Sequence, residues 1–205
     1  MITELHNKDI NINKLVAQVN EDESLILELL DNLNSKEETI RYNSYQIIKG
    51  ISLKYPEKLY SYRDEFGKKL YIDNAYQMLI GIIILAHLCV VDKDHKFEQI
   101  FNKYCSLLND RRITVSLYVL SNLGRIAKVK PNLQEKITII LLDSKNTHHK
   151  HKGLIAGAAI ESFEKYYIEI EDKEKVLEFV KEQIVCDSPK TRKSAVEFLT
   201  KWDNK

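Results

Sequence analysis

The residues best suited to chemistry lie in one short polar run, from Lys145 to Lys152. The run holds three histidines: His148, His149 and His151. Histidine near a turn is a common zinc ligand, and His148 and His151 would share one face of a helix. The run supplies no Cys, Asp or Glu to complete a tetrahedral set, and its lysines oppose a cation. We predict no metal site here, and interpret the run as a solvated basic helix start suited to a phosphate or an acidic partner.

A second group of polar residues recurs at helical spacing. Thr114, Tyr118, Ser121, Arg125 and Lys128 follow one another at steps of four and three residues, so they form one polar stripe opposite an apolar one. A stripe with an aromatic ring and two cations could hold a peptide, an acidic segment or a phosphate. The same pattern also fits a solvated helix face that binds nothing.

Catalytic and cofactor motifs are missing from the rest of the chain. The sequence has no Gly-x-Ser-x-Gly, no Walker-type loop, no Gly-x-Gly-x-x-Gly, no Cys-x-x-Cys and no His-Glu-x-x-His. His87 stands alone in an apolar segment, where a neutral, hydrogen-bonded core histidine is expected. We therefore predict no catalytic residue and no cofactor.

The overall charge and the cysteines narrow the class of protein. The 205 residues carry 31 Lys and Arg against 30 Asp and Glu, a net charge of +1, so the chain lacks the basic field of a dedicated nucleic-acid binder. Cys89, Cys105 and Cys186 are widely spaced and odd in number, which favours free thiols in a reducing compartment. The N-terminus shows no secretory pattern, so we expect a cytoplasmic protein.

The elements that must position these residues are helices, because Gly occurs 6 times and Pro 3 times in the whole chain. The 14 residues from Met78 to Val91 are apolar on nearly every side, which is short of the ~20 that a membrane span needs and predicts a buried central helix. Elsewhere apolar residues recur at steps of three and four, in five helical hairpins. The second helices follow turns at Ser35, Asp73, Asp110, Ser144 and Ser188, 34 to 44 residues apart. Two-helix units at this period are typical of an α-solenoid.

The last hairpin carries a resemblance to a known family. Residues 187–199 resemble the second helix of a HEAT-type repeat, with a polar turn at Asp187-Ser188-Pro189, a basic residue at Arg192 and a small residue one turn later. A looser copy runs from Asn34 to Ser44. The resemblance implies an all-α fold, a right-handed α-solenoid (α-α superhelix) of about five HEAT-like hairpins, related to armadillo-type repeats.

The same resemblance sets the expected domains and one set of structural charges. Residues 1–22 are expected to form a polar N-terminal arm or cap, and residues 23–205 a single HEAT-like repeat domain. In HEAT proteins the Asp and Arg of the pattern form a ladder between repeats. By that analogy Asp187, Arg192 and Arg41 are expected to be structural, because a partly buried charge needs a partner.

The function that this architecture implies is partner binding. Second helices of a solenoid line its concave face, and the polar stripe from Thr114 to Lys128 and the histidine run are expected there. We predict a non-enzymatic scaffold that binds a protein partner. The alternative is a nucleic-acid-binding protein or a DNA glycosylase of the HEAT-like alkylation-repair type, which the near-neutral charge disfavours. The residues that favour the alternative are Arg111, Arg112, Arg125, Lys128, Lys130 and the run from Lys145 to Lys152. HEAT-like di-iron hydroxylases are disfavoured because no His-Glu dipeptide occurs.

Overall fold

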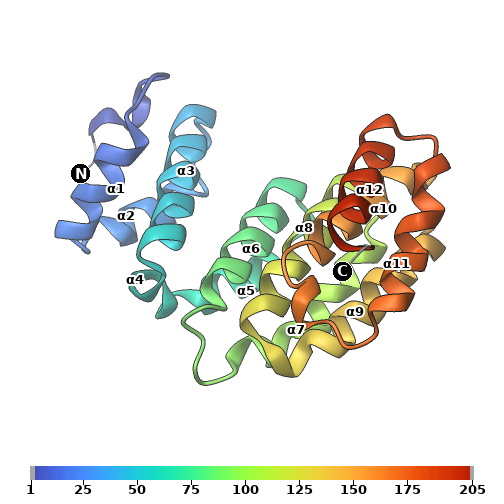
Figure 1. Cartoon of the computed structure of the whole chain (residues 1–205). Coiled ribbons are helices and arrows are strands. Elements are labelled where there is room, and N and C mark those ends of the chain that lie inside the picture. Colours follow the sequence, from blue (N-terminus) through green and yellow to red (C-terminus); the bar gives the residue numbers. More distant parts are fainter. Residues whose placement is uncertain (1–2, 204–205) are drawn as a thin grey trace.

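The computed structural model describes residues 3–203, and this range contains α-helices and short 3-10 turns but no strand. One layer holds α1 (Ile12–Glu21), α2 (Leu25–Asn32), α4 (Pro56–Tyr60), α5 (Arg63–Lys69), α7 (Lys96–Ser106), α9 (Gln134–Asp143) and α11 (Lys173–Glu182). The other layer holds α3 (Glu38–Lys54), α6 (Ala75–Leu88), α8 (Ile113–Val129), α10 (Lys152–Phe163) and α12 (Pro189–Trp202). Figure 1 shows the helices of this second layer following one another from the N-terminal to the C-terminal end, each against the next. The predicted all-α solenoid is confirmed.

The repeat period is regular. The second-layer helices begin at Glu38, Ala75, Ile113, Lys152 and Pro189, so successive starts differ by 37, 38, 39 and 37 residues. Polar contacts between neighbouring repeats keep the same interval: Lys130 binds Asp92, Ser162 accepts a hydrogen bond from Gly124, and Thr191 donates one to Gly153, each across 38 residues. Each repeat therefore meets its neighbour in nearly the same register.

The central helix α6 is buried on almost every side, as its sequence predicts. Asn74 caps its first turn, because the side-chain oxygen accepts a hydrogen bond from the Gln77 amide at 3.1 Å. All side chains from Ile80 to Leu88 are buried. α3 and α8 pack on the two sides of α6 and α5 packs against it as well, so an apolar surface all round is required.

Two helices of the first layer are shorter than the sequence suggests. Apolar residues recur at helical spacing from Leu59 to Leu70, but a turn divides this segment into α4 and α5. At the N-terminus, α1 packs against α3 and buries Leu15, Val16 and Val19. The first two repeats therefore carry three helices each.

The start of the fourth second-layer helix differs from the prediction. It was expected directly after Ser144, but α10 begins only at Lys152. Ser144–Asn146 form a 3-10 turn, and residues 147–151 are irregular. The physical reason is that no apolar side chain appears between Leu142 and Leu154, so nothing in this run could hold a helix against the core. His148 and His151 consequently do not share a helical face.

The expected charged ladder is made by other residues. The Arg41 and Arg192 guanidinium groups each donate to a backbone carbonyl six residues earlier, those of Ser35 at 2.8 Å and Cys186 at 2.7 Å. These hydrogen bonds close the turn within their own repeats, and within residues 3–203 neither arginine forms an ion pair with a neighbouring repeat. Asp73 forms one ion pair between repeats, because it accepts from Arg112 of the next repeat at 3.0 Å.

Candidate functional site

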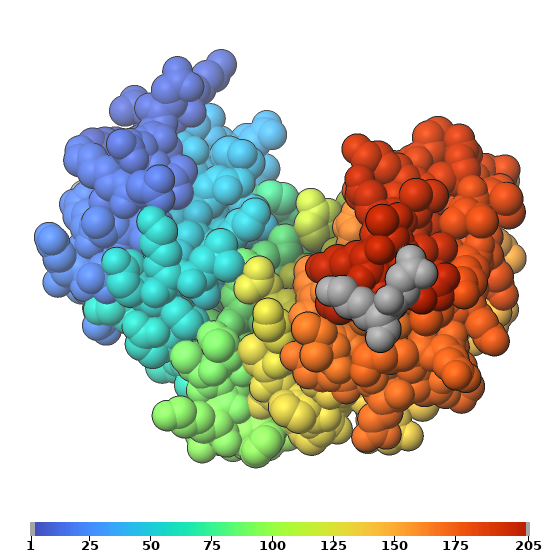
Figure 2. All heavy atoms as spheres, in the orientation of Figure 1, coloured from blue at the N-terminus to red at the C-terminus, as the bar shows by residue number. Residues whose placement is uncertain are grey.

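The polar stripe predicted on α8 lies on its solvent side. Thr114, Tyr118, Arg125 and Lys128 are exposed, and Ser121 is half-buried. The opposite side of α8 is buried between α6 and α10. Figure 2 shows a hollow between the N-terminal repeats and the C-terminal repeats, with the middle of the chain at its floor. The second-layer helices face this hollow, which we call the concave face (Figures 1 and 2).

Two adjoining pockets deepen the C-terminal half of the concave face. The first, of about 220 Å³, lies between α8, α10 and α12 and reaches Ser121 of the stripe. The second, of about 290 Å³, lies between α10 and α12. Both are lined by Glu161 and Ser194, so they form one continuous groove. A groove of this kind can take an extended segment of another chain.

The N-terminal half of the concave face carries tyrosines. Tyr45 of α3 and Tyr76 of α6 meet edge to face with ring centroids 6.0 Å apart, and the Arg41 guanidinium lies 5.4 Å from the Tyr76 centroid. Burial raises the pKa of Tyr45, and the neighbouring Tyr118, Tyr76 and Tyr42 raise it further. Tyr118 and Tyr42 keep 40% and 53% of their surface exposed. Such rings offer contact area at low entropic cost.

His87, near the C-terminal end of α6, is uncharged. Its Nδ1 lies 2.7 Å from the Ser52 hydroxyl, which donates its own proton to the Lys49 carbonyl at 2.8 Å. The hydroxyl has one proton only, so the imidazole Nδ1–H donates to the Ser52 oxygen. Burial, and then the charges of Arg125 and Lys49, lower the pKa of His87 to about 3. The prediction of a neutral, hydrogen-bonded histidine is confirmed.

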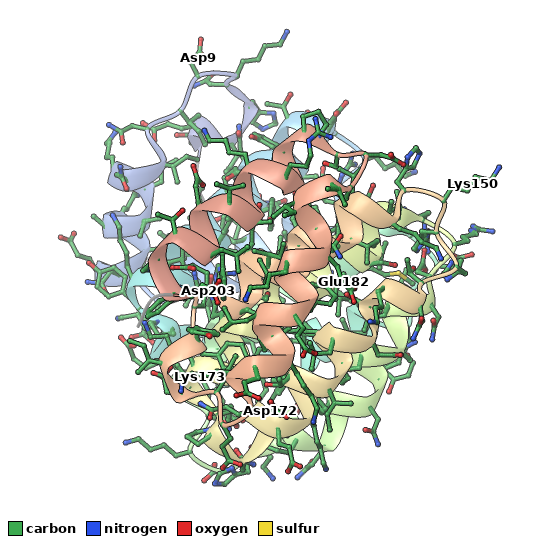
Figure 3. All side chains as sticks on the ribbon, turned by 45° about the vertical axis from the view of Figure 1, so that its right-hand side comes forward. Asp9, Lys150, Asp172, Lys173, Glu182 and Asp203 are labelled. Atoms are coloured by element: carbon green, nitrogen blue, oxygen red, sulfur yellow. The ribbon has the colours of Figure 1, made fainter. Side chains whose placement is uncertain are left out.

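The histidine run lies apart from the stripe. His149 is buried, and its Nε2 lies 2.9 Å from the hydroxyl of Ser116, which points away from the stripe on the far side of α8. His148 packs on His149 with ring centroids 4.0 Å apart, and His151 precedes α10 as its exposed N-cap. Figure 3 shows Lys150 of the same loop projecting away from the protein. The structure therefore does not bring the two predicted groups together.

Several cations that favoured nucleic acid binding are engaged within the protein. Arg112 forms a forked pair with Asp110 at 2.7 and 2.8 Å, and this hydrogen bonding lowers the pKa of Asp110 to about 2. Arg111 contacts Asp73 at 3.3 Å. Lys130 is 3% exposed and binds Asp92, so its charge does not reach a ligand surface. A broad basic field of the kind that a duplex requires is not built from these residues.

Sequence reasoning missed the buried ion pair between Lys130 and Asp92. The ammonium lies 2.6 Å from the Asp92 carboxylate, which also accepts from Tyr60 and from two backbone amides. Burial raises the pKa of Asp92, but these hydrogen bonds outweigh it and lower that pKa to about 2. Asp92 and Tyr60 also line an outer pocket of about 370 Å³ with an apolar floor. The 38-residue interval between Asp92 and Lys130 was the available signal, because it equals one repeat.

The described residues provide little for metal or redox chemistry. No three His, Cys, Asp or Glu side chains among residues 3–203 gather in a way that could hold a metal ion. Cys89, Cys105 and Cys186 are free thiols, and burial raises the pKa of Cys105 to about 12 and that of Cys89 further. In the same range, every helix is too short or too polar to cross a bilayer.

Comparison with known proteins places the fold in a class. No family model matches the sequence, and no curated protein matches it. Among solved structures, the chain is similar to a designed armadillo repeat protein with a TM-score of 0.61 and 14% sequence identity, over 92% of this chain and 86% of that one. At this identity the likeness concerns the fold alone. The chain thus has the fold of an α-helical solenoid similar to armadillo repeats.

Proposed function

We propose that this protein is a non-enzymatic, cytoplasmic repeat scaffold that binds a protein partner through its concave face. The observation that carries the proposal is that the cations and the tyrosine of the α8 stripe are exposed and the cations are unpaired in the described part of the chain. Within residues 3–203, Arg125 and Lys128 form no ion pair, and Tyr118 keeps 40% of its surface exposed. The armadillo-type fold supports the proposal, since repeats of this kind offer extended concave binding surfaces. The three free thiols support a reducing compartment.

The geometry favours a chain segment over a small molecule. The stripe, the tyrosines and the two adjoining pockets lie on successive second-layer helices, so together they form a long open surface. Small-molecule sites are usually single enclosed pockets, whereas protein interfaces combine aromatic anchors with a polar rim. The concave face resembles a protein interface in this respect.

Capture from a lysate of the source organism, followed by mutation, tests the proposal. The tagged chain is incubated with the lysate with and without nuclease, and partners are identified by mass spectrometry. The variant combining Tyr118→Ala, Arg125→Ala and Lys128→Ala is expected to weaken binding of the captured protein at least about tenfold, because it removes an aromatic anchor and two cations. Lys136→Ala on the outer layer is the control. If the triple variant binds as the native chain does, the concave face is not the binding surface.

The nuclease arm addresses the nucleic-acid alternative. Partners that disappear after nuclease treatment would indicate binding through nucleic acid. The pairing of Arg111, Arg112 and Lys130 with carboxylates makes this result unexpected.

A further inference from the structure

One basic side chain per repeat recurs at the same place in the concave layer. Lys49, His87, Arg125, Lys165 and Lys201 follow one another at intervals of 38, 38, 40 and 36 residues. Four of them lie in the C-terminal part of α3, α6, α8 and α12, and Lys165 follows the last turn of α10. The intervals match the repeat period, so these side chains form a row across neighbouring helices. We call it the basic row.

Contacts between neighbouring repeats show that members of the row approach one another. Ser52, one turn after Lys49, is hydrogen-bonded to His87 at 2.7 Å. Arg125 and Lys49 both lie near enough to lower the pKa of His87, after burial. Lys165 donates a hydrogen bond to the Ser121 carbonyl on α8 and is close enough to Arg125 for the guanidinium to lower its pKa, again after burial. The first four members therefore lie side by side.

Three cations of the row have no counter-ion of their own. Within residues 3–203, Lys49, Arg125 and Lys165 form no ion pair. Glu161, whose charge acts on the pKa of Lys165, is itself paired with Lys190 at 2.7 Å. Lys201 at the end of the row is neutralised by Glu164. Positive charges that are neighbours without counter-ions repel one another, and an anion bound from outside relieves the repulsion.

We propose that the basic row binds an acidic segment of the partner protein, held extended, with carboxylates spaced six and then three residues apart so that they meet Lys49, Arg125 and Lys165. This inference rests on the proposed function and names the chemistry of the partner. The charge complementarity of Lys49, Arg125 and Lys165 carries it.

The spacing of the row selects the conformation of the segment. Packed helices lie about 8–10 Å apart. A polyproline II segment rises about 3.1 Å per residue with three residues per turn, so every third side chain points the same way at intervals of about 9 Å. In a β-strand, side chains three residues apart point to opposite faces. Because His87 is neutral, carboxylates six residues apart meet Lys49 and Arg125, and one three residues further on meets Lys165.

The row fits a spaced acidic peptide better than a continuous polyanion. Glu161 and Glu164 flank its C-terminal half, and both carboxylates line the adjoining pocket. A nucleic acid strand would bring a phosphate close to these groups, whereas a peptide places neutral residues between its carboxylates.

Fluorescence anisotropy with labelled peptides tests the inference on the full chain. The probe is (Glu-Pro-Ser)₅, in which proline favours the extended conformation. Two comparison peptides are (Lys-Pro-Ser)₅ and a peptide of the probe's composition with its five glutamates contiguous. We expect the probe to bind at least about tenfold more tightly than either comparison peptide, and its affinity to fall as salt rises from about 0.05 to 0.3 M.

Single substitutions locate the binding. Lys49→Ala, Arg125→Ala and Lys165→Ala are each expected to weaken probe binding about three- to tenfold. Lys136→Ala on α9 is expected to leave it unchanged. Lys165→Gln provides a second variant at the position that also contacts α8, and far-UV circular dichroism checks that each variant is folded.

The outcomes separate this inference from the proposed function. Equal or tighter binding of the lysine peptide, no binding of the probe, or unchanged affinity in the three alanine variants overturns the inference. Displacement of the probe by oligo(dT) at lower concentration than by unlabelled probe overturns it too. If the captured partner loses binding to the Tyr118, Arg125 and Lys128 triple variant but its mapped segment is basic or neutral, the proposed function stands and the acidic segment does not. If that triple variant leaves the partner bound, the proposed function itself fails.

Discussion

Replacing Lys130 by methionine is the sharpest test of how neighbouring repeats are held together. Its ammonium donates to the Asp92 carboxylate at 2.6 Å and to the Asp92 backbone carbonyl at 2.7 Å, and both side chains are nearly fully buried. Methionine keeps the length of the side chain and removes the charge. The variant therefore leaves a buried carboxylate without its cation, while Tyr60 still donates to that carboxylate.

The expected loss follows from the protonation equilibrium of Asp92. A pKa lowered from 3.8 to about 2 corresponds to about 2.4 kcal/mol of stability at neutral pH. Breaking a buried ion pair by removing one partner costs about 3–5 kcal/mol in other proteins. We expect Lys130→Met to lower the free energy of unfolding by about 3 kcal/mol, the low end of that range, because Tyr60 and two backbone amides still bind the carboxylate.

The pH dependence has a definite sign. A carboxyl group whose pKa is lowered in the folded state contributes stability above its unfolded pKa and loses that contribution as the pH falls from about 3.8 toward 2. The difference between the native chain and Lys130→Met is therefore largest at neutral pH and shrinks as the pH falls below about 3.8 and Asp92 becomes protonated.

Urea unfolding followed by circular dichroism at pH 7 and at pH 3 measures both effects. Lys128→Met, on the exposed side of α8 two residues before Lys130, is the matched control and is expected to change stability by less than about 0.5 kcal/mol. The double variant Asp92→Asn with Lys130→Met is expected to be more stable than Lys130→Met alone, because the buried Asp92 charge is removed together with its cation. A loss below about 1 kcal/mol, or a double variant less stable than the single one, would refute the reasoning.

Two further predictions concern packing and pH. Gly124→Ala is expected to destabilise the chain by about 1–3 kcal/mol in urea unfolding, since its new Cβ would lie 2.2 Å from the Ser162 carbonyl oxygen where α8 and α10 approach. The control is Gly67→Ala in α5, whose new Cβ meets no atom within 4 Å and which should be neutral or stabilising by up to about 1 kcal/mol. Equal effects at the two sites would contradict the close approach of α8 and α10. His87 has a folded pKa of about 3 against 6.5, so the unfolded state takes up its proton first and stability falls as the pH drops from 6.5 toward 3. His87→Gln is expected to flatten that part of a stability profile measured by urea unfolding, and an unchanged slope would show that His87 is charged in the folded protein.

The fold was largely readable from the sequence because solenoid helices depend on local patterns. Five second-layer helices follow from apolar residues at helical spacing, from the capped turn at Asn74 and from Pro189 at a helix start. The predicted start of α10 was wrong by eight residues, since a turn was placed at Ser144 while the following run offers no apolar side chain. A polar turn residue is followed by a stable helix only where the first helical turns pack against the core.

The candidate site was readable only in part, because contacts between repeats decide which polar residues stay free. The exposure of the α8 stripe follows from its own periodicity. The burial of His149 depends on Ser116, 33 residues away, and the engagement of Lys130 depends on Asp92, so no local pattern reveals either. The basic row was hidden for a related reason. Turn positions spaced unevenly by 34 to 44 residues obscure a period that the helix starts show to be 37 to 39.

The regular period places charged residues of this protein in two different environments. Residues one period apart meet at equivalent places on neighbouring helices, so a pair such as Asp92 and Lys130 is buried at the repeat boundary and contributes to stability. On the concave side the same interval aligns residues of like charge, and Lys49, Arg125 and Lys165 gain nothing from one another. His87 fills the remaining place as a neutral donor to Ser52, which reduces the repulsion along the row. Binding of an acidic segment would offset the repulsion between the cations of the row. In the free protein this repulsion is limited because His87 stays uncharged.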